Sequence, residues 1–360
     1  MSFLFKNIIS IYNIFLINIK IFFIKIILKK KIIFFYHPKK KLTKNNLTFI
    51  TDYFKKKKKY YFLYGSTLIF YKSNFFLIKQ SYLKFLYGVD LFLSNNVCDK
   101  FTPKSVKVYL HHDIYDTPLV EKSKEKKLLS KLNNYNFIVV ATQHGKKVFE
   151  NLFNKNPNVK IVVFKYLKID YILKKIKQSK IKQTKTILIA PTNYLSFPKM
   201  SMQSKLNVIF QILLKNNYRV IYRPHPSNFD DLKVIKLKSK YENYKNFIFD
   251  NSPDYFESYK ISNFLLTDIS GTAYTYAVTT TKPALFFNIN EVYNKLLKYN
   301  ELNYFKNINK IGWKVNSTNK IIEILNNKQK VSNKKNKIFK FRKIFLQTKD
   351  LDLKYFLNND

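Results

Sequence analysis

The chain is poor in glycine, with five glycines in 360 residues. Phosphate-binding loops of the Walker type and the dinucleotide fingerprint Gly-x-Gly-x-x-Gly each need several closely spaced glycines, and the sequence contains neither pattern. The usual sequence support for a kinase, an NTPase or a nicotinamide-dependent dehydrogenase is therefore missing. A phosphate site in this protein has to be built in another way.

Cysteine is scarcer still, since Cys98 is the only one in the sequence. A single cysteine excludes an internal disulfide and any cysteine-based zinc site. This usage fits a reduced, cytoplasmic setting.

Arginine is also rare, with only Arg219, Arg223 and Arg342 among 66 lysines and arginines. The formal net charge of +44 favours anionic partners such as nucleic acid, anionic lipid or a phosphate-rich substrate. However, Lys, Asn, Ile, Phe and Tyr are enriched together along the whole chain, which suggests a low-GC coding bias. Because the sequence contains neither an arginine cluster nor a recognised nucleic-acid module, we expect no nucleic-acid partner.

Residues 3–28 are apolar but are interrupted by Lys6, Lys20 and Lys25. The longest lysine-free stretch, residues 7–19, is shorter than the roughly 20 apolar residues that a bilayer span needs. Two interpretations remain open: an amphipathic helix that lies on an anionic membrane surface, or a helix packed on the first domain. The first interpretation predicts a cytoplasmic protein that is peripheral on the inner face of the cell membrane.

Beyond residue 31, short apolar runs alternate with polar and helical patterns, which is typical of buried parallel strands in an α/β fold. The length favours about two domains. We therefore predict two doubly wound Rossmann-like domains that face a cleft. The expected parts are an amphipathic helix (1–30), an N-terminal domain (31–165), a linker (166–185), a C-terminal domain (186–326) and a C-terminal helix or tail (327–360).

A candidate phosphate site follows the predicted strand 264–267. Asp268 ends this strand, and Ser270, Gly271 and Thr272 lead into a predicted helix. The N-terminus of a helix carries free N–H groups and a partial positive charge, so it is suited to bind phosphate. The two hydroxyls would add donors, and the glycine would let an anion approach the backbone. Simple helix capping by Ser270 or Asp268 is the structural alternative.

A second candidate follows the predicted strand 219–222, where the chain reads Arg223, Pro224, His225, Pro226. The two prolines restrict the backbone on both sides of the histidine and end the strand. A rigid histidine beside an arginine suits the stabilisation of negative charge during phosphoryl transfer. The alternative is an ordinary exposed loop.

The first half offers His111, His112 and Asp113 at the end of the predicted strand 106–110. Histidine is the side chain best suited to act as a general base near neutral pH. The adjacent histidines would point to opposite faces of a strand, so they converge poorly on a metal ion. We expect no metal site here.

These motifs together resemble the CDP-glycerol glycerophosphotransferases of teichoic-acid and capsule synthesis. That family pairs a His-Gly-Thr-Pro-like segment in the first domain with Arg-x-His-Pro and Thr-Asp-Tyr-Ser-Ser in the second. The matching segments are residues 110–119, 223–226 and 267–272, and the resemblance covers roughly residues 105–290. It implies a two-domain fold of the GT-B type.

The resemblance also implies roles for these residues. His112 would act as the base on the acceptor hydroxyl, and His225 would contact the phosphates of a CDP-activated donor. Arg223, Ser270, Gly271 and Thr272 would complete the phosphate site, with Asp268 and Asp113 in support. The product would be a phosphodiester, with release of CMP and no cofactor.

Three functions follow from this reading. The first is transfer of glycerol phosphate, or another polyol phosphate, from a CDP-polyol to a hydroxyl of a surface glycan or lipid-linked precursor. The second is a GT-B glycosyltransferase that uses a sugar nucleotide for capsule or lipopolysaccharide. The third is a non-catalytic glycan- or membrane-binding protein, which the presence of both His112 and His225 disfavours. Asp113, Ile269 and Gly271 depart from the family pattern, and these changes bear on the acceptor and the polyol.

Overall fold

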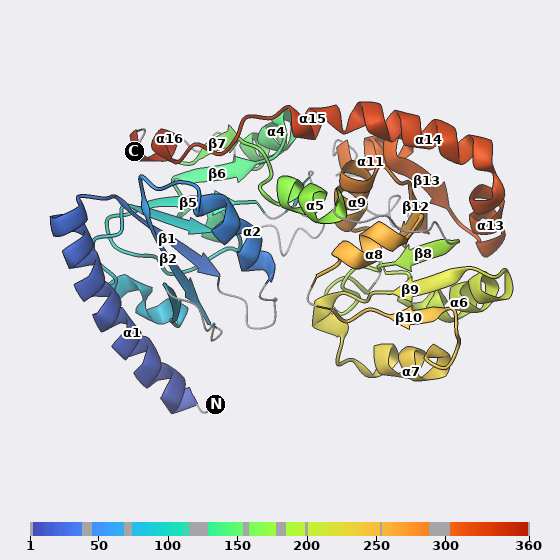
Figure 1. The fold of residues 1–360 in the computed structure, drawn as a ribbon, viewed down its shortest axis with the longest axis horizontal. Helices are drawn as coiled ribbons and strands as arrows, with labels where there is room; N and C mark the ends of the chain where they lie inside the picture. Colours follow the sequence, from blue (N-terminus) through green and yellow to red (C-terminus); the bar gives the residue numbers. More distant parts are fainter. Residues whose placement is uncertain are drawn as a thin grey trace. The chain divides into compact units, whose positions relative to one another are not determined.

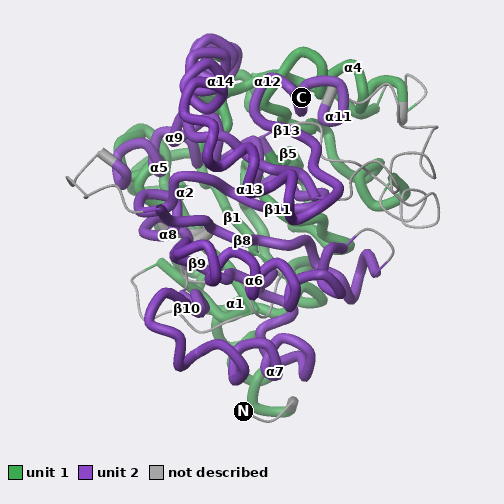
Figure 2. Tube along the Cα trace, turned by 90° about the vertical axis from the view of Figure 1, so that its right-hand side faces the viewer, with its two compact units in different colours: residues 1–113, 119–167, 348–360 green, residues 114–118, 168–347 purple. Residues whose placement is uncertain are grey.

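The structure, a computed structural model, describes residues 3–37, 45–67, 74–111, 113–114, 129–153, 158–177, 185–198, 201–252, 254–287 and 303–358. The chain forms two compact units, which Figure 2 shows in two colours. Unit 1 comprises residues 1–113, 119–167 and 348–360, and unit 2 comprises residues 114–118 and 168–347.

Unit 1 contains a parallel sheet of seven strands in the order β3-β2-β1-β4-β5-β6-β7 (Figure 1). Its strands are β1 (Ile32–His37), β2 (Tyr61–Ser66), β3 (Phe75–Leu77), β4 (Leu91–Ser94), β5 (Val106–Leu110), β6 (Phe137–Val140) and β7 (Lys160–Val163). Its helices are α1 (Phe3–Phe23), η1 (Ile24–Leu28), α2 (Asn45–Phe54), η2 (Gln80–Phe85), α4 (Gln143–Leu152) and α16 (Leu353–Asn358).

The central strand β1 is buried along its whole length, as expected for a strand covered on both faces of a parallel sheet. Alternate residues of a strand point to opposite faces. On one face, Phe34 of β1 lies in the same core as Ile17 of α1. On the other face, next to Ile33, Phe62 of β2 stacks on Phe54 of α2 with ring centroids 4.7 Å apart. Helices α1 and α2 therefore cover opposite faces.

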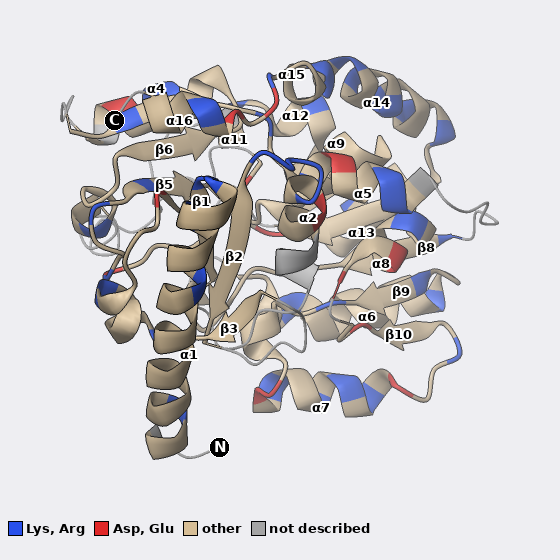
Figure 3. Cartoon of the chain, turned by 60° about the vertical axis from the view of Figure 1, so that its left-hand side comes forward, with Lys and Arg blue, Asp and Glu red and all other residues tan. Residues whose placement is uncertain are grey.

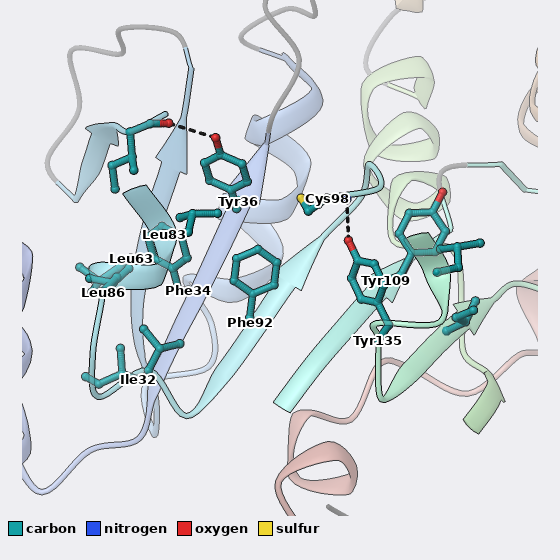
Figure 4. Close-up of a cluster of buried hydrophobic side chains, with 14 of the residues drawn as sticks. Ile32, Phe34, Tyr36, Leu63, Leu83, Leu86, Phe92, Cys98, Tyr109 and Tyr135 are labelled. Carbon is teal, nitrogen blue, oxygen red and sulfur yellow. Dashed lines mark hydrogen bonds between the residues drawn. The ribbon is translucent and has the colours of Figure 1, made fainter. Parts of the chain in front are cut away.

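The core on the α1 side is rich in aromatic rings and also buries the single cysteine (Figure 4). The hydroxyl of the buried Tyr135 accepts a hydrogen bond from the backbone N–H of Cys98, at 2.9 Å. Burial raises the pKa of the Cys98 thiol to about 12, so the thiol is protonated at neutral pH. Cys98 is thus a packing residue of unit 1.

Helix α1 is attached to unit 1 by one face. Its buried isoleucines, Ile14, Ile17 and Ile21, lie in the unit 1 core. The Asn13 amide donates to the backbone carbonyl of Leu77 at 2.9 Å, and the Asn18 amide donates to that of Phe85 at 2.9 Å. The interpretation of residues 3–28 as a helix packed on the first domain is therefore correct for this face.

Unit 2 contains a parallel sheet of six strands in the order β10-β9-β8-β11-β12-β13. Its strands are β8 (Thr186–Ile189), β9 (Arg219–Tyr222), β10 (Phe247–Phe249), β11 (Phe264–Thr267), β12 (Ala284–Phe287) and β13 (Gly312–Val315). Its helices are α5 (Lys168–Lys177), η4 (Gln203–Lys205), α6 (Leu206–Lys215), η5 (Pro226–Asn228), α7 (Leu232–Tyr241), α8 (Phe256–Ile261), α9 (Thr272–Thr280), α11 (Asn303–Lys306), α12 (Ile308–Ile311), α13 (Thr318–Asn326), α14 (Lys328–Phe341) and α15 (Lys343–Leu346).

Helix α9 is the most deeply buried helix element around the site described below, with every side chain from Ala273 to Thr279 buried. Such a helix needs apolar or internally bonded residues on all sides, and its sequence, rich in Ala, Tyr and Thr, meets this need. Helix α6 contributes Ile209 and Phe210 to a separate core with β8 and β9. The predicted fold class, two doubly wound α/β sheets with an N-terminal apolar helix, is confirmed.

The C-terminal segment, expected as a helix or tail, contributes to both units. Helices α14 and α15 belong to unit 2, whereas residues 348–360 belong to unit 1. There, Phe356 of α16 packs on Phe137 and Phe164, with ring centroids 5.2 and 5.7 Å apart. The last residues therefore complete the core of the first unit.

Candidate active site

The sheet of unit 2 has a point at which the chain reverses its direction of winding. It starts in the centre with β8, adds β9 and β10 on one side, and returns to add β11, β12 and β13 on the other. The loops after β8 and β11 therefore leave neighbouring parallel strands in opposite directions. In open α/β sheets, ligands bind at this point, beyond the carboxyl ends of the strands.

Asp268 fixes the two loops at this point. Its side chain is buried, with one carboxylate oxygen accepting from the N–H of Thr192 at 2.8 Å and the other from that of Met202 at 2.9 Å. Burial raises the pKa of Asp268 to about 6, although the N–H groups of Met202 and Thr192 act in the opposite direction. Asp268 therefore joins the end of β11 to the loop after β8.

The first turn of α9 begins directly after Asp268. The Ser270 hydroxyl accepts from the N–H of Thr272 at 3.3 Å, and the Ser270 carbonyl accepts from the N–H of Ala273 at 3.1 Å. Ser270 thus caps the helix, as the structural alternative proposed. Its hydroxyl still has a hydrogen to donate, and Ser270, Gly271 and Thr272 are only partly buried.

Gly271 has an ordinary right-handed helical backbone, with φ of −58°. Its importance therefore does not come from a left-handed conformation that other residues avoid. The preceding turn is held by Tyr304, whose hydroxyl accepts from the N–H of Ser270 at 2.9 Å and donates to its carbonyl at 3.0 Å. Tyr304 of α11 is a buried positioning residue that the sequence reading missed.

His225 lies at the end of β9, one strand away from β8, and is partly exposed. Its Nδ1 accepts from the backbone N–H of Ser227 at 3.2 Å, and its carbonyl accepts from the N–H of Asn228 at 2.7 Å. Since Nδ1 is the acceptor, a neutral imidazole carries its proton on Nε2. The motif therefore holds a histidine whose Nε2–H is a hydrogen-bond donor.

Arg223 is directed into unit 2 and not toward solvent. Its guanidinium lies 2.8 Å from the carboxylate of Asp250 and donates to the hydroxyl of Ser252 at 3.1 Å and to its carbonyl at 3.0 Å. Burial raises the pKa of Asp250, but Arg223 and the hydroxyls of Ser252 and Ser258 outweigh this effect, so its pKa is lowered overall. The guanidinium thus ties the ends of β9 and β10 together beside His225.

In unit 1, the histidine pair follows β5. His111 packs against Phe149 of α4 with ring centroids 5.2 Å apart, and its Nε2 lies 4.0 Å from the carboxylate of Asp113. His112 lies outside the described residues. The structure therefore places Asp113 and the half-buried His111, which adjoins the predicted base, within unit 1.

Unit 1 has its own reversal point, between β1 and β4. There, Nδ1 of the buried His37 lies 3.0 Å from the Asn95 amide oxygen and 3.2 Å from the Asn96 amide nitrogen. His37 precedes Pro38 at the end of the first predicted strand, a position that favours a structural role, and the sequence alone does not point to the two asparagines. Nothing in the linear sequence linked residues 58 positions apart, because sheet pairing brings them together.

Among the residues that the structure describes, no group of three or more His, Cys, Asp or Glu side chains is arranged to hold a metal ion. The ionic groups at the carboxyl edge of the unit 2 sheet are instead bound to backbone N–H groups or to each other. What this edge offers chemically is a set of hydrogen-bond donors: a helix N-terminus, hydroxyls and one imidazole N–H.

The profile of the family described as CDP-glycerol:poly(glycerophosphate) glycerophosphotransferase matches residues 91–352. This match extends over most of the chain and includes residues 110–119, 223–226 and 267–272, the three segments that carry the resemblance. The protein belongs to this family, and it is a transferase that moves glycerophosphate from CDP-glycerol. No curated protein sequence matches the chain.

Solved structures agree on the fold. A histidine-to-alanine variant of the wall teichoic acid polymerase TagF is similar with a TM-score of 0.63 and 17% identity, covering 98% of this chain and 96% of the other. TagF itself gives a TM-score of 0.60 at 19% identity, with coverage of 96% and 93%. A UDP-N-acetylglucosamine 2-epimerase from Listeria monocytogenes gives 0.56 at 12%, with coverage of 90% and 100%. The fold is therefore of the GT-B type, as expected.

Proposed function

We propose that the carboxyl edge of the unit 2 sheet binds the diphosphate of CDP-glycerol. The observation that carries this proposal is the first turn of α9, where Ser270, Gly271 and Thr272 follow the buried Asp268 at the reversal point of the sheet. A helix N-terminus with adjacent hydroxyls attracts phosphate oxygens. A TagF variant has been soaked with CDPG, which supports a donor of this class.

His225 would donate its Nε2–H to a phosphate oxygen. The hydrogen bond from the Ser227 N–H to Nδ1 places the proton of the neutral imidazole on Nε2. A donor aimed at the oxygen that leaves with CMP would stabilise the negative charge that develops there. In this proposal Arg223 does not bind phosphate directly; it positions the His225 loop through Asp250 and Ser252.

The reaction is a displacement at phosphorus. The acceptor hydroxyl attacks the phosphorus that carries glycerol, the bond from this phosphorus to the CMP oxygen breaks, and the hydroxyl proton passes to a base. We assign His112 as this base by its place in the family motif, with Asp113 in support. The donor is already activated, so the proposed chemistry uses no cofactor.

The acceptor is proposed to be a surface glycan or a lipid-linked precursor, reached at the cytoplasmic face of the membrane. Helix α1 and the adjoining η1 support this location, because the face opposite their buried isoleucines exposes large apolar side chains to solvent. Those with exposed fractions of at least 37% are Leu4, Phe5, Ile8, Ile11, Tyr12, Phe15, Leu16, Ile19, Phe22, Phe23, Ile26, Ile27 and Leu28. An apolar patch of this kind usually contacts a partner or a lipid surface.

By length and composition, Leu4–Leu28 is the one helical segment in the described residues that could cross a membrane. We favour an orientation parallel to the membrane surface. The backbone of unit 1 accepts from Asn13 and Asn18, and the N–H of Tyr87 donates to Asn18 at 3.0 Å. A spanning orientation would break these bonds and uncover the isoleucine face.

The test is a substrate panel with the full chain: CDP-glycerol, CDP-ribitol and UDP-sugars, with CMP and UDP release measured. CMP release from CDP-glycerol should fall by about 10²- to 10⁴-fold in both His112→Ala and His225→Ala. His144→Ala, which removes a partly exposed histidine in the first turn of α4, should retain normal activity. Undiminished turnover in His225→Ala would overturn the assigned site, and UDP release without CMP would overturn the donor.

A further inference from the structure

A cavity of about 370 Å³ lies in unit 1, at the end of the α1–η1 helix. Three of its nine lining residues are lysines, Lys25, Lys31 and Lys104, and only one, Asp90, is acidic. The lining therefore carries a net charge of +2 on these side chains. This cavity belongs to neither of the sites described above.

The geometry around Asp90 concentrates the positive charge. One carboxylate oxygen lies 3.2 Å from the ammonium nitrogen of Lys31 and 3.3 Å from that of Lys25. The other oxygen accepts from the backbone N–H of Ile32 at 2.7 Å, at the start of β1. A single carboxylate thus draws two ammonium groups to the same place, and one positive charge of this pair stays uncompensated.

Gly88, which lines the cavity, allows this part of unit 1 to pack closely against α1. This residue has a left-handed backbone, with φ of +75°, and a Cβ at its position would lie 2.8 Å from a methyl group of Ile21. The loop can approach the helix so closely only because the side chain is absent. The cationic cavity and the helix therefore form one continuous surface of unit 1.

Exposed apolar side chains lie close in the sequence to the residues that line the cavity. Ile26, Ile27 and Leu28 of η1 are 57%, 67% and 50% exposed and lie between Lys25 and Lys31 in the sequence. Phe85, the last residue of η2, and Tyr87, directly before Gly88, are 45% and 58% exposed. Figure 3 shows the helix as almost entirely uncharged, with isolated lysines. A free anion needs no such apolar surroundings, whereas an anionic lipid presents a phosphate beside hydrocarbon.

We propose that this cavity binds the phosphate of an anionic phospholipid headgroup through Lys25, Lys31 and Lys104, while the exposed face of α1 contacts the acyl chains. The proposal rests on the membrane association proposed above and adds the lipid that is selected. Lysine ammonium groups near a membrane surface attract anionic lipids, and their long stems allow the charge to reach the headgroup level.

The experiment compares binding of the full chain to vesicles of phosphatidylcholine alone and to vesicles that also contain phosphatidylglycerol. The Lys25→Gln, Lys31→Gln, Lys104→Gln triple variant should bind the anionic vesicles on the order of 100-fold more weakly, since each lysine contributes about fivefold. Asp90→Asn should bind them several-fold more tightly, because the competing carboxylate is neutralised.

A matched control separates a site from general attraction. The triple variant Lys236→Gln, Lys328→Gln, Lys337→Gln removes the same charge from exposed positions of unit 2 and should bind as the native chain does. An equal loss of binding in this control would overturn the headgroup site. Native binding of both Asp90→Asn and the Lys25→Gln, Lys31→Gln, Lys104→Gln variant, each measured separately, would also overturn it. Binding of inorganic phosphate as tight as that of the anionic vesicles would overturn a lipid ligand.

A further variant tests the underlying membrane association by itself. Phe15→Ser with Phe22→Ser removes apolar surface from the exposed face of α1 and should weaken binding to both kinds of vesicle. Native binding of this variant would count against the membrane association, whereas loss of lipid selectivity alone is expected only from the cavity variants. Thermal unfolding and CMP release from CDP-glycerol check that each variant is folded.

Discussion

The two units of this protein have the same central strand order but use their reversal points differently. In unit 1, the point between β1 and β4 is occupied by the buried side chains of His37, Asn95 and Asn96, which contact one another. In unit 2, the point between β8 and β11 has the N-terminus of α9 and the partly exposed Ser270 and Thr272. The same topology therefore produces an internal polar cluster in one unit and, in the other, an edge with hydrogen-bond donors that we propose binds the donor phosphates.

The difference depends on a few residues after each strand. Asp268 uses both carboxylate oxygens on backbone N–H groups, so the chain can continue directly into a helix. His37, the last residue of β1, instead contacts the side chain of Asn95, which directly follows β4. Fold alone does not define a site, and the residues at the strand ends decide which edge binds ligand.

The largest effect should come from removing the guanidinium that supports the unit 2 edge. Arg223→Met leaves the buried carboxylate of Asp250 without its partner, which should cost about 3–5 kcal/mol of unfolding free energy. Denaturant unfolding measures this loss. Arg219→Met, in the same strand, is the control and should cost much less. Equal costs would mean that the Asp250 pair does not hold this edge.

A pH series tests the second support of the same edge. The pKa of Asp268 is raised by burial from 3.8 to about 6, so between these values the folded protein holds a proton that the unfolded chain has released. Its unfolding free energy should therefore fall as the pH rises from about 4 to above 6, by about 3 kcal/mol from this group. The stability deficit of Asp268→Asn relative to the native chain should shrink over the same range.

The matched control for this series is Asp230→Asn, which changes an exposed carboxylate of unit 2. The change of stability with pH in Asp268→Asn is measured relative to the change in this control. If the deficit of Asp268→Asn were constant, the carboxyl group would not titrate in this range, and its buried environment would be incorrectly described.

A smaller effect is expected in unit 1, where His37→Ala removes the ring between Asn95 and Asn96. Leaving these buried amides with fewer partners should cost about 1–3 kcal/mol of unfolding free energy. The KM for CDP-glycerol should stay within about twofold of native, because this cluster is assigned no role in donor binding. A large rise in KM with native stability would remove the distinction between the two reversal points.

Much of the sheet structure could be predicted from short apolar runs. The runs at 219–222 and 264–267 coincide with β9 and β11, because buried parallel strands are continuously apolar. Helix α7 was not predicted, since lysines interrupt its apolar period, and β13 was missed because only two of its four residues are buried. Residues 67–71 form an apolar run that predicts a further strand, and the pattern of residues 119–132 predicts a helix. Both segments lie mostly outside the described residues.

The residues of the candidate site could be selected from the sequence, but their contacts could not. Strand ends, prolines and a helix start are local features, so His225, Ser270 and Thr272 could be selected from the sequence. The partner of Arg223 could not, because Asp250 reaches it through the pairing of β9 with β10. Tyr304 likewise contacts the turn before α9 from 34 residues away. Such pairs follow from tertiary structure and leave no local signal.

The most direct test of the central claim is calorimetric binding of CDP to the full chain and to two variants, one for each reversal point. In Ser270→Ala with Thr272→Val, the loss of hydroxyl donors to a charged phosphate should raise the Kd by at least about tenfold. In His37→Ala, the Kd should be that of the native chain. Native affinity in the unit 2 variant, or lost affinity in the unit 1 variant, would contradict the assignment of the donor to unit 2.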